Sequence, residues 1–581
     1  MGKSLLRFAF LLFLRLVALG IGTTGAVSSF AQTRPNAGTL LEQQSPAPVP
    51  LPPDRPRLVL PDAKPVVPGD ASVRITPSAF RFTGNSVFDS EVLTLLLAEL
   101  IDRPTNVAGL TAAASKVAAY YRSQGYLLTE AYLPEQAFAT AGGTITIRVI
   151  EAKIGRVSVE LEGDGRGVSK TFVEELLASH LKNGDAITEY ALDKPVLLLR
   201  DLAGYNATAI VEPGTALGEA NVRVAVNAKS RYVDGSVSLD NFGATAAGAA
   251  RAVASINLNN LSGRGDVLAV GGQLSDQPGS HLFRLGYTSP VGGLGTRLGV
   301  SAARLNYALG KQFAALGATG KADIFGLNLS HPLVRGRDAN VYAQVSAEQK
   351  QLLDQTATPV LKSEREIVTI RMGLAGNFVD KLVGATAFNS YSFGSTFGRL
   401  QLDAADLAVD AGLGGLQTAG SFKKFNADYQ RTQYFSGASS LHFTAQAQLA
   451  SKNLGSAEKM ALGGPSGVRA YPVGEGVGDS GAMFSLEYRY QLPSSVSVLT
   501  EPLSLLTFYD YGHVRFNQNG PAIAGAANAT TLGAVGVGAM LGRTGNFLIK
   551  THLAWRTTYV LPSTGDVDRS PRAWLSAQTW F

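Results

Sequence analysis

The strongest constraint on the fold is a two-residue alternation of apolar and polar residues that runs from residue 230 to the C-terminus. This period is that of a β-strand with one apolar and one wet face. Past the N-terminus there is no uninterrupted apolar run of about 20 residues, the length that a helix needs to cross a bilayer. Any membrane span must therefore be a strand. One clear example is 441–449, where Leu441, Phe443, Ala445, Ala447 and Leu449 alternate with His442, Thr444, Gln446 and Gln448.

The apolar face of these strands carries mostly Ala, Val and Leu, and the opposite face carries Arg, Gln and Glu. Small apolar residues outside and polar residues inside are typical of a lipid-facing wall around a watery lumen. A soluble β-solenoid is the alternative, although the strand spacing is irregular. Aromatic residues near strand ends suit the interfacial girdles of a barrel, among them Tyr287, Tyr488, Tyr490, Trp555 and Tyr559.

The size of the barrel follows from its length. Residues 229–581 provide about 17 strands at roughly 20 residues per strand with its turns, and bacterial barrels prefer even numbers. We therefore expect a transmembrane antiparallel barrel of about sixteen strands. Because side chains cannot fill so wide a lumen, another part of the chain must gate or plug it.

The first 31 residues have the pattern of a secretory signal peptide. Lys3 and Arg7 precede the apolar stretch 8–14, and Ser29-Phe30-Ala31 is a small-x-small cleavage site. A buried N-terminal helix is the alternative interpretation. The pattern predicts that the chain is exported.

Residues 32–72 predict a short helix at 37–44, which contains Leu40 and Leu41, followed by a proline-rich linker. Repeated prolines fix many φ angles and favour a semi-rigid polyproline spacer. A disordered tail is the alternative. A helix at the far end of a spacer suggests that the helix docks elsewhere in the molecule.

Two tandem modules of similar length follow, at 73–152 and 153–228. Their periodicity changes from strand to helix and back, in the order β-α-α-β-β. In the first module helices are expected at 89–100 and 107–124, and in the second at 170–180 and 189–202. The repeated order indicates one small α+β module used twice.

Composition argues against catalysis. The chain has no Cys, which excludes thiolate nucleophiles and Cys-based zinc sites. Its six histidines are far apart, none begins a metal-ligand spacing, and there is no Gly-x-Ser-x-Gly elbow. The net charge is +6, and the sequence has no block of basic residues that would mark a nucleic-acid surface. We expect no enzyme, no cofactor, no metal and no nucleic-acid partner.

Five motifs resemble those of the two-partner secretion transporters, also called TpsB or ShlB/FhaC/HecB-type haemolysin secretion/activation proteins, within the superfamily of POTRA-bearing barrels. The resemblance covers nearly the whole mature chain. The motifs are Gly-Tyr-Leu-Leu-Thr-Glu-Ala-Tyr-Leu-Pro at 125–134, Ser-Leu-Asp-Asn-Phe-Gly at 238–243, Gly-Gly-Pro-Ser-Gly-Val-Arg-Ala-Tyr at 463–471, Phe-Tyr-Asp-Tyr-Gly at 508–512, and the terminal Phe581.

The resemblance implies a long loop that folds into the lumen and carries the motif Val468-Arg469-Ala470-Tyr471 at its tip. In the family, the loop arginine meets the aspartate of a Phe-x-Asp-x-Gly strand, which is Phe508-x-Asp510-x-Gly512 here. The alternative is that Arg469 and Asp510 are ordinary lumen charges that face water. Ala470 stands where the family has Gly, so a positive φ at that point would strain the loop.

Three further residues take roles from the resemblance. Glu487 and Arg489 match the Glu-x-Arg that follows the same loop, and they either support the loop or merely line the pore. Phe581 matches the C-terminal aromatic that is read by the machinery inserting outer-membrane barrels; chance placement is the alternative.

The function implied is export without ATP. An unfolded secreted partner would pair with strand edges of the two POTRA modules in the periplasm, pass through the barrel once loop and helix vacate it, and fold outside. The implied partners are a TpsA-like exoprotein, outer-membrane lipid and the barrel-assembly machinery. A barrel-assembly insertase is the leading rival, and a passive porin for small solutes is the second.

Overall fold

The computed structural model describes twelve stretches of the chain, and the predicted signal peptide and most of the proline-rich linker lie outside them. The described residues are 34–42, 58–59, 74–137, 143–162, 167–228, 232–276, 279–435, 437–495, 501–520, 527–564, 566 and 568–581.

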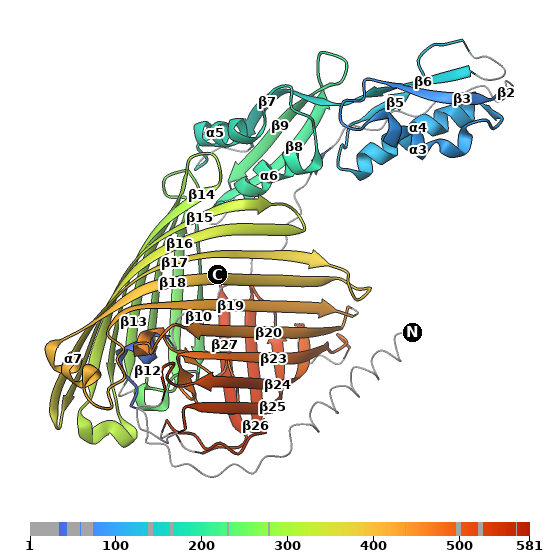
Figure 1. Cartoon of the computed structure of the whole chain (residues 1–581). Coiled ribbons are helices and arrows are strands. Elements are labelled where there is room, and N and C mark those ends of the chain that lie inside the picture. The colour runs from blue at the N-terminus through green and yellow to red at the C-terminus, as the bar shows by residue number, and fades with distance from the viewer. Residues whose placement is uncertain are drawn as a thin grey trace.

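Sixteen antiparallel strands close into a barrel, which confirms the predicted fold class and strand number (Figure 1). Each strand pairs with its neighbour in sequence, and β27 pairs with β10. The strands are β10 Val233–Asp240, β11 Arg251–Asn259, β12 Val267–Ser275, β13 Ser280–Val291, β14 Thr296–Ala308, β15 Thr319–Arg335, β16 Ala339–Ala357, β17 Val360–Asp380, β18 Ala387–Leu402, β19 Gly420–Tyr434, β20 Ser439–Ala450, β23 Ser480–Gln491, β24 Leu503–Arg515, β25 Ala529–Gly542, β26 Phe547–Arg556 and β27 Arg572–Trp580.

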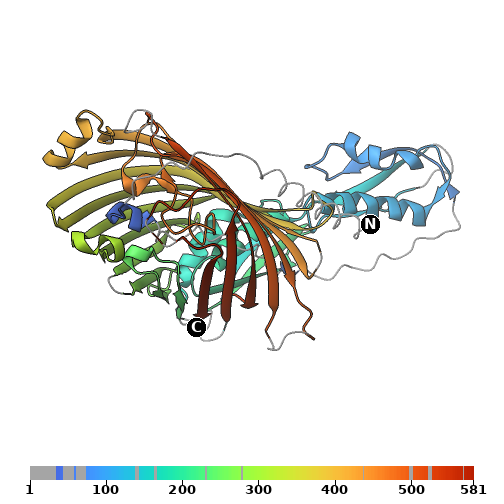
Figure 2. The ribbon, with the colours of Figure 1, turned by 90° about the horizontal axis from the view of Figure 1, so that it is seen from below.

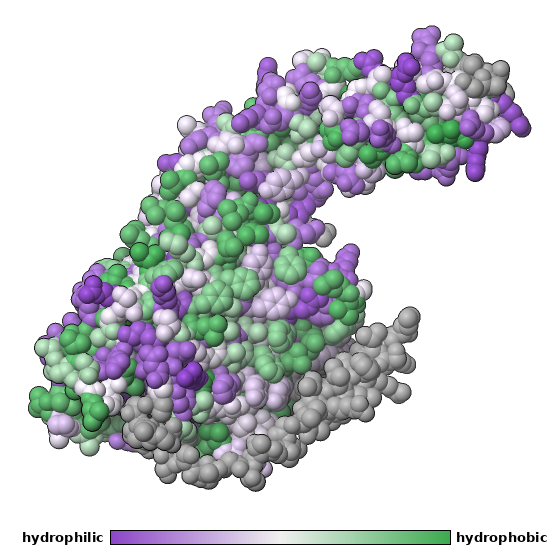
Figure 3. All heavy atoms as spheres, viewed as in Figure 1, coloured by the Kyte–Doolittle hydropathy of each residue, from purple (hydrophilic) through white to green (hydrophobic). Residues whose placement is uncertain are grey.

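The outer wall of the barrel is apolar, as the alternation predicts. Along β17, the large side chains of Val368, Ile370, Met372 and Leu374 are each about half exposed on the outer face. Figure 3 shows hydrophobic residues gathered over the barrel wall. Lipid tails cover such a surface in a membrane. Of the predicted girdle residues, Tyr559 lies in the loop after β26, with 91% of its surface exposed.

The seam between the first and last strands is the shortest pairing in the barrel. β10 and β27 share five residue pairs, from Ser236–Trp580 to Asp240–Ser576, whereas β16 and β17 share nineteen. Gly235 and Phe581 extend the seam with two backbone hydrogen bonds of 3.1 Å. A Cβ atom on Gly235 would lie 2.6 Å from Cζ of Phe581, so glycine lets the terminal ring approach closely.

Module 1 is a three-stranded sheet, ordered β3-β6-β5, with helices packed against it. The second strand of the predicted β-α-α-β-β order is short, three residues long, because residues 126–129 form a turn rather than strand. The elements are β2 Arg74–Ile75, β3 Pro77–Thr83, α3 Ser90–Leu96, η1 Ala98–Leu100, β4 Thr105–Asn106, α4 Val107–Ser123, β5 Glu130–Tyr132 and β6 Gly143–Ile150.

Module 2 repeats this element order and gains one strand from the linker. The sheet runs β1-β8-β9-β7, and its core includes Phe172, Leu176, Val196 and Val224. Side-chain oxygens of Ser169 and Thr188 cap the two helices. The elements are β1 Leu58–Val59, β7 Lys153–Leu161, α5 Lys170–His180, α6 Glu189–Arg200, β8 Tyr205–Pro213 and β9 Glu219–Ala228.

Two arginines fasten module 2 to the turn between β15 and β16. Arg335, only 4% exposed, donates from Nε and Nη2 to the two oxygens of Asp201 at 2.8 and 2.7 Å. Arg337 pairs with Asp193 at 2.5 Å and with Glu189 at 2.7 Å. Burial raises the pKa of the Asp193 carboxyl despite the opposing effect of Arg337. Module 2 therefore sits at the barrel mouth, and module 1 extends away from it (Figures 1 and 2).

The seam offers a test of barrel closure, because the chain has no native cysteine. Ser238 and Gln578 are Cα partners across it, so a disulfide between Ser238→Cys and Gln578→Cys is expected to form. The loss of loop entropy in the unfolded chain should stabilise the fold by about 6 kcal/mol. The control pair, Ser238→Cys with Val253→Cys, closes a much shorter loop and should stabilise it by about 3 kcal/mol. The measurement is the temperature at which the folded band disappears on an SDS gel. A seam link that protects no better than the control would contradict closure.

Candidate functional site

A long loop at residues 451–479, here called the lumen loop, leaves β20 and returns to β23. It contains η4 Ser456–Glu458 and a small hairpin of β21 Met460–Ala461 and β22 Val477–Gly478. Its tip is enclosed: Val468, Arg469, Ala470 and Tyr471 are each at most 5% exposed. A loop between transmembrane strands that is buried to this degree occupies the lumen.

Asp510, on β24, is the main partner of Arg469. Its Oδ2 accepts from the Arg469 backbone N–H at 3.1 Å and from Nε at 2.9 Å, and Oδ1 accepts from Nη2 at 2.8 Å. Ser485, on β23, donates to the same carboxylate at 2.7 Å. Asp510 is fully buried, so this carboxylate faces the loop and not water.

Three more side chains complete the enclosure of Arg469. Nη1 donates to Glu487 at 2.6 Å, and the guanidinium carbon lies 3.3 Å from the ring centre of Phe508. Trp574, on the final strand, donates from Nε1 to the Arg469 carbonyl oxygen at 2.7 Å. Arg489 in turn donates to Glu487 at 2.6 Å. The two arginines and two carboxylates balance formally, as burial of charge requires.

Alternation along β24 explains why Phe508, Asp510 and Gly512 all point into the lumen. Gly512 has a steric role, because a Cβ there would lie 2.9 Å from Cδ2 of Leu462 in the lumen loop. The Phe508 ring likewise lies against Gly536 of the next strand, where a Cβ would be 2.1 Å from it. These two glycines let loop, ring and wall pack in close contact.

Ala470 causes none of the strain that a positive φ would bring, because its φ is not positive. The neighbouring Tyr471 is fully buried, and its hydroxyl lies 2.8 Å from Oγ1 of Thr558 in the loop after β26. The tip is therefore held from both sides, by β23 and β24 at Arg469 and by an extracellular loop at Tyr471.

A short helix, α2 Ala37–Glu42, occupies the lumen beside this loop (Figures 1 and 2). Leu40 and Leu41 are 2% and 6% exposed and pack on an apolar patch of the inner wall. The Ala37 N–H donates to Asp354 on β16 at 2.8 Å. We call α2 the plug helix. The same apolar cluster includes Leu305, Leu352, Ile367, Leu400 and Phe422 of the wall.

The plug helix and the lumen loop touch directly. A Cβ on Gly38 would lie 2.4 Å from Oγ of Ser456 and 2.6 Å from the Ala457 nitrogen, so no side chain fits there. The next residue, Glu458, is 2% exposed and pairs with Lys350 at 2.8 Å and Lys424 at 2.9 Å. The loop thus has a second ionic anchor, on β16 and β19, next to its contact with the helix.

Sequence reasoning missed several of these partners. Trp574 belongs to none of the five motifs and lies on the inner face of the last strand. Asp354 and Glu458 carry no motif. On a barrel strand every second side chain points into the lumen, and this alternation identifies Asp354 as an inward residue. It says nothing about Glu458, which lies in the loop.

The described residues contain no group of three or more His, Asp or Glu side chains that could hold a metal ion. None of the described helices is long and apolar enough to cross a bilayer.

The ionic anchor at the loop tip can be tested with a thiol reporter. Val468 is 1% exposed, so a Val468→Cys thiol should react slowly with a water-soluble maleimide. Adding Asp510→Asn leaves the Arg469 charge short of its main partner, a change that costs about 3–5 kcal/mol for buried pairs. We expect labelling to speed up at least tenfold.

Asp568→Asn is the matched control, because Asp568 is half exposed and pairs with Arg556 outside the lumen loop. It should leave the labelling rate unchanged. Equal rates in all three backgrounds would show that Asp510 does not hold the tip.

Comparison with known proteins agrees with this architecture. The family model described as haemolysin secretion/activation protein ShlB/FhaC/HecB matches residues 218–533, more than half of the chain. A second model, the ShlB-type POTRA domain, matches residues 75–152, which is module 1.

Curated relatives match along most of their length. The heme/hemopexin transporter protein HuxB of Haemophilus influenzae (strain 86-028NP) is 28% identical over 84% of this chain and 83% of its own. The outer membrane transporter CdiB of Dickeya dadantii is 23% identical over 71% of each chain.

Among solved structures, CdiB from Escherichia coli superposes with a TM-score of 0.67 at 19% identity, covering 93% of this chain and 95% of that one. CdiB from Acinetobacter baumannii gives 0.60 at 14% identity, covering 88% and 91%. Both share the fold. The chain belongs to the ShlB/FhaC/HecB family of haemolysin secretion/activation proteins, the outer-membrane transporters of two-partner secretion, which carry their POTRA domains in the periplasm.

Proposed function

We propose that this chain exports a secreted partner protein from the periplasm through its barrel, without ATP. One observation carries the proposal: the lumen of a sixteen-stranded barrel is filled by two segments of the chain itself, the lumen loop and the plug helix. Both are held by side-chain contacts rather than by membership of the wall. They can therefore leave while the wall stays intact.

Recognition begins on the modules. Each module has a small sheet with edge strands, and an unfolded polypeptide can add a strand to such an edge. Main-chain hydrogen bonds give this contact little side-chain selectivity, which suits a substrate that must slide onward. Because the paired segment is short, binding stays reversible.

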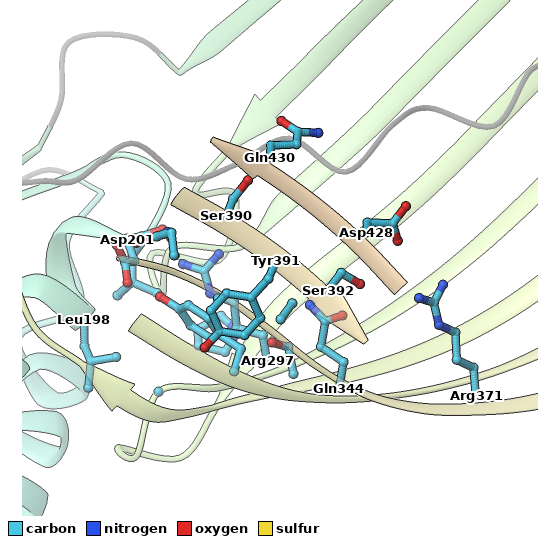
Figure 4. A pocket seen from close by; sticks show the side chains of 18 of the residues that line it. Leu198, Asp201, Arg297, Gln344, Arg371, Ser390, Tyr391, Ser392, Asp428 and Gln430 are labelled. Carbon is cyan, nitrogen blue, oxygen red and sulfur yellow. Dashed lines mark hydrogen bonds between the residues drawn. The ribbon is translucent and has the colours of Figure 1, made fainter. Parts of the chain in front are cut away.

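The path into the barrel passes a cavity of 330 Å³ where module 2 meets the barrel mouth, lined by apolar residues of module 2 and by polar residues of the barrel (Figure 4). Barrel side chains that line it include Gln344, Arg371, Asp428 and Gln430, whereas Leu198 and Asp201 come from module 2. Polar groups of both signs can exchange hydrogen bonds with a passing backbone without holding any one side chain. This lining suits an extended peptide of varied sequence.

The driving force lies outside the cell, because the periplasm supplies no ATP. A substrate that folds after it emerges cannot slip back, so passage becomes one-way. The printed names of the relatives, a heme/hemopexin transporter and an outer membrane transporter, support transport for this chain as well. Its own substrate is a TpsA-like exoprotein.

Two further partners, lipid and the barrel-assembly machinery, interact with the barrel wall and its last strand. Outer-membrane lipid covers the apolar wall. The barrel-assembly machinery reads the C-terminal strand, where Phe581 is held against Gly235 at the seam. The insertase and porin alternatives are not favoured, since the family match is to secretion proteins and a porin has no use for two modules.

Substitution of the loop anchor tests the proposal. Arg469→Ala and Asp510→Ala each leave a buried partner unpaired, so the loop should lose its defined position and obstruct the path of the substrate. We expect export of the partner to fall at least tenfold, while the amount of heat-modifiable barrel in the outer membrane stays at the wild-type level. The measurement is an immunoblot of secreted partner against membrane fractions.

Arg543→Ala is the matched control, because Arg543 is mostly exposed and pairs only with Glu501 among the described residues. It should export normally. If the Arg469 and Asp510 variants also export at wild-type levels, the lumen loop has no role in gating.

A further inference from the structure

One edge of module 2 is already taken by a strand from the linker. In the sheet β1-β8-β9-β7, strand β8 pairs with β9 on one side and with β1 on the other. Leu58 lies opposite Ala209, and Val59 lies opposite Ile210, in parallel orientation. Within the described residues, the rest of this edge of β8 has no strand partner.

The linker sequence limits how far this strand can pair. Pro56 and Pro61 flank it, and a proline has no N–H to donate to a ladder. The described pairing spans two residues of β8, which is nine residues long. A proline-free strand could pair along more of the same edge and would hold it more tightly, since each residue pair adds backbone hydrogen bonds.

We propose that this edge of β8 is the docking site of the substrate strand, and that β1 is a built-in competitor which the substrate displaces. The inference rests on the proposed export function and names its binding edge. The partner is an unfolded segment without proline that runs parallel to β8 over more than two residues. The linker strand keeps the edge closed to other chains until such a segment arrives.

Displacement of β1 also changes the tether of the plug helix. Sixteen residue steps separate Glu42 at the end of α2 from Leu58, and thirty-two separate Glu42 from Arg74 at the start of module 1. At about 3.4 Å per extended residue, the maximum reach grows from about 55 Å to about 110 Å when β1 leaves β8. Docking of substrate on module 2 thereby lengthens the tether of the helix that blocks its path.

The first test locks the linker strand in place. Ile210 is half-buried, whereas Ala209 faces the core, so Val59→Cys with Ile210→Cys is the suitable pair in a chain that has no native cysteine. The oxidised protein should lose export at least tenfold, and dithiothreitol should restore it. Failure of the thiols to join would remove the pairing on which the proposal rests.

Ser158→Cys with Arg223→Cys is the matched control, because these residues are parallel partners in the same sheet but do not restrain the linker. It should export equally in both redox states. Full export by the locked Val59–Ile210 protein would overturn the inference and leave the export function standing, whereas loss of the export function itself would show as no export in the reduced protein and the wild type.

The second test measures the freed edge directly on the purified full chain in detergent. Leu58→Pro with Val59→Pro removes both N–H groups of β1, so a fluorescent peptide with the sequence of residues 54–63 should bind this variant at least tenfold more tightly than it binds the wild type. Equal binding to the two proteins would show that β1 does not occlude the edge.

Discussion

Everything in this molecule depends on the need to pair each backbone N–H and C=O that faces lipid, where water offers no alternative. A sheet meets that need only by closing on itself, and here it closes with sixteen strands. Closure at that size leaves a lumen that wall side chains cannot fill. The chain fills it with a helix from before the modules and a loop from between two strands, and both remain separate from the wall.

Filling a lumen with removable segments requires contacts that are strong in place and yet can be exchanged for water. Arg469 fits this need, because its guanidinium is satisfied by Asp510, Glu487 and Ser485, all of which are polar groups that water can solvate once the loop has left. A hydrophobic tip of the same size would resist removal more strongly. The ionic tip thus favours a gate over a permanent plug.

The sequence predicted the architecture because period and parity are local properties. The alternation of apolar and polar residues predicted the barrel. The same alternation along β24 predicted that Phe508, Asp510 and Gly512 face the lumen. The partners of the plug helix were beyond its reach: Asp354 lies 317 residues from Ala37, and no local pattern joins them. The same holds for β1, since only the tertiary fold brings Leu58 to Ala209.

The contact between Gly38 and η4 leaves no space for a side chain, so the plug helix and the lumen loop share one closely packed interface, and each loses contacts if the other leaves first. In an electrical recording across a planar bilayer, two independent obstructions would produce intermediate sublevels of current. A jointly packed obstruction instead opens in a single large step. The glycine at this contact thus determines the conductance signature of the pore.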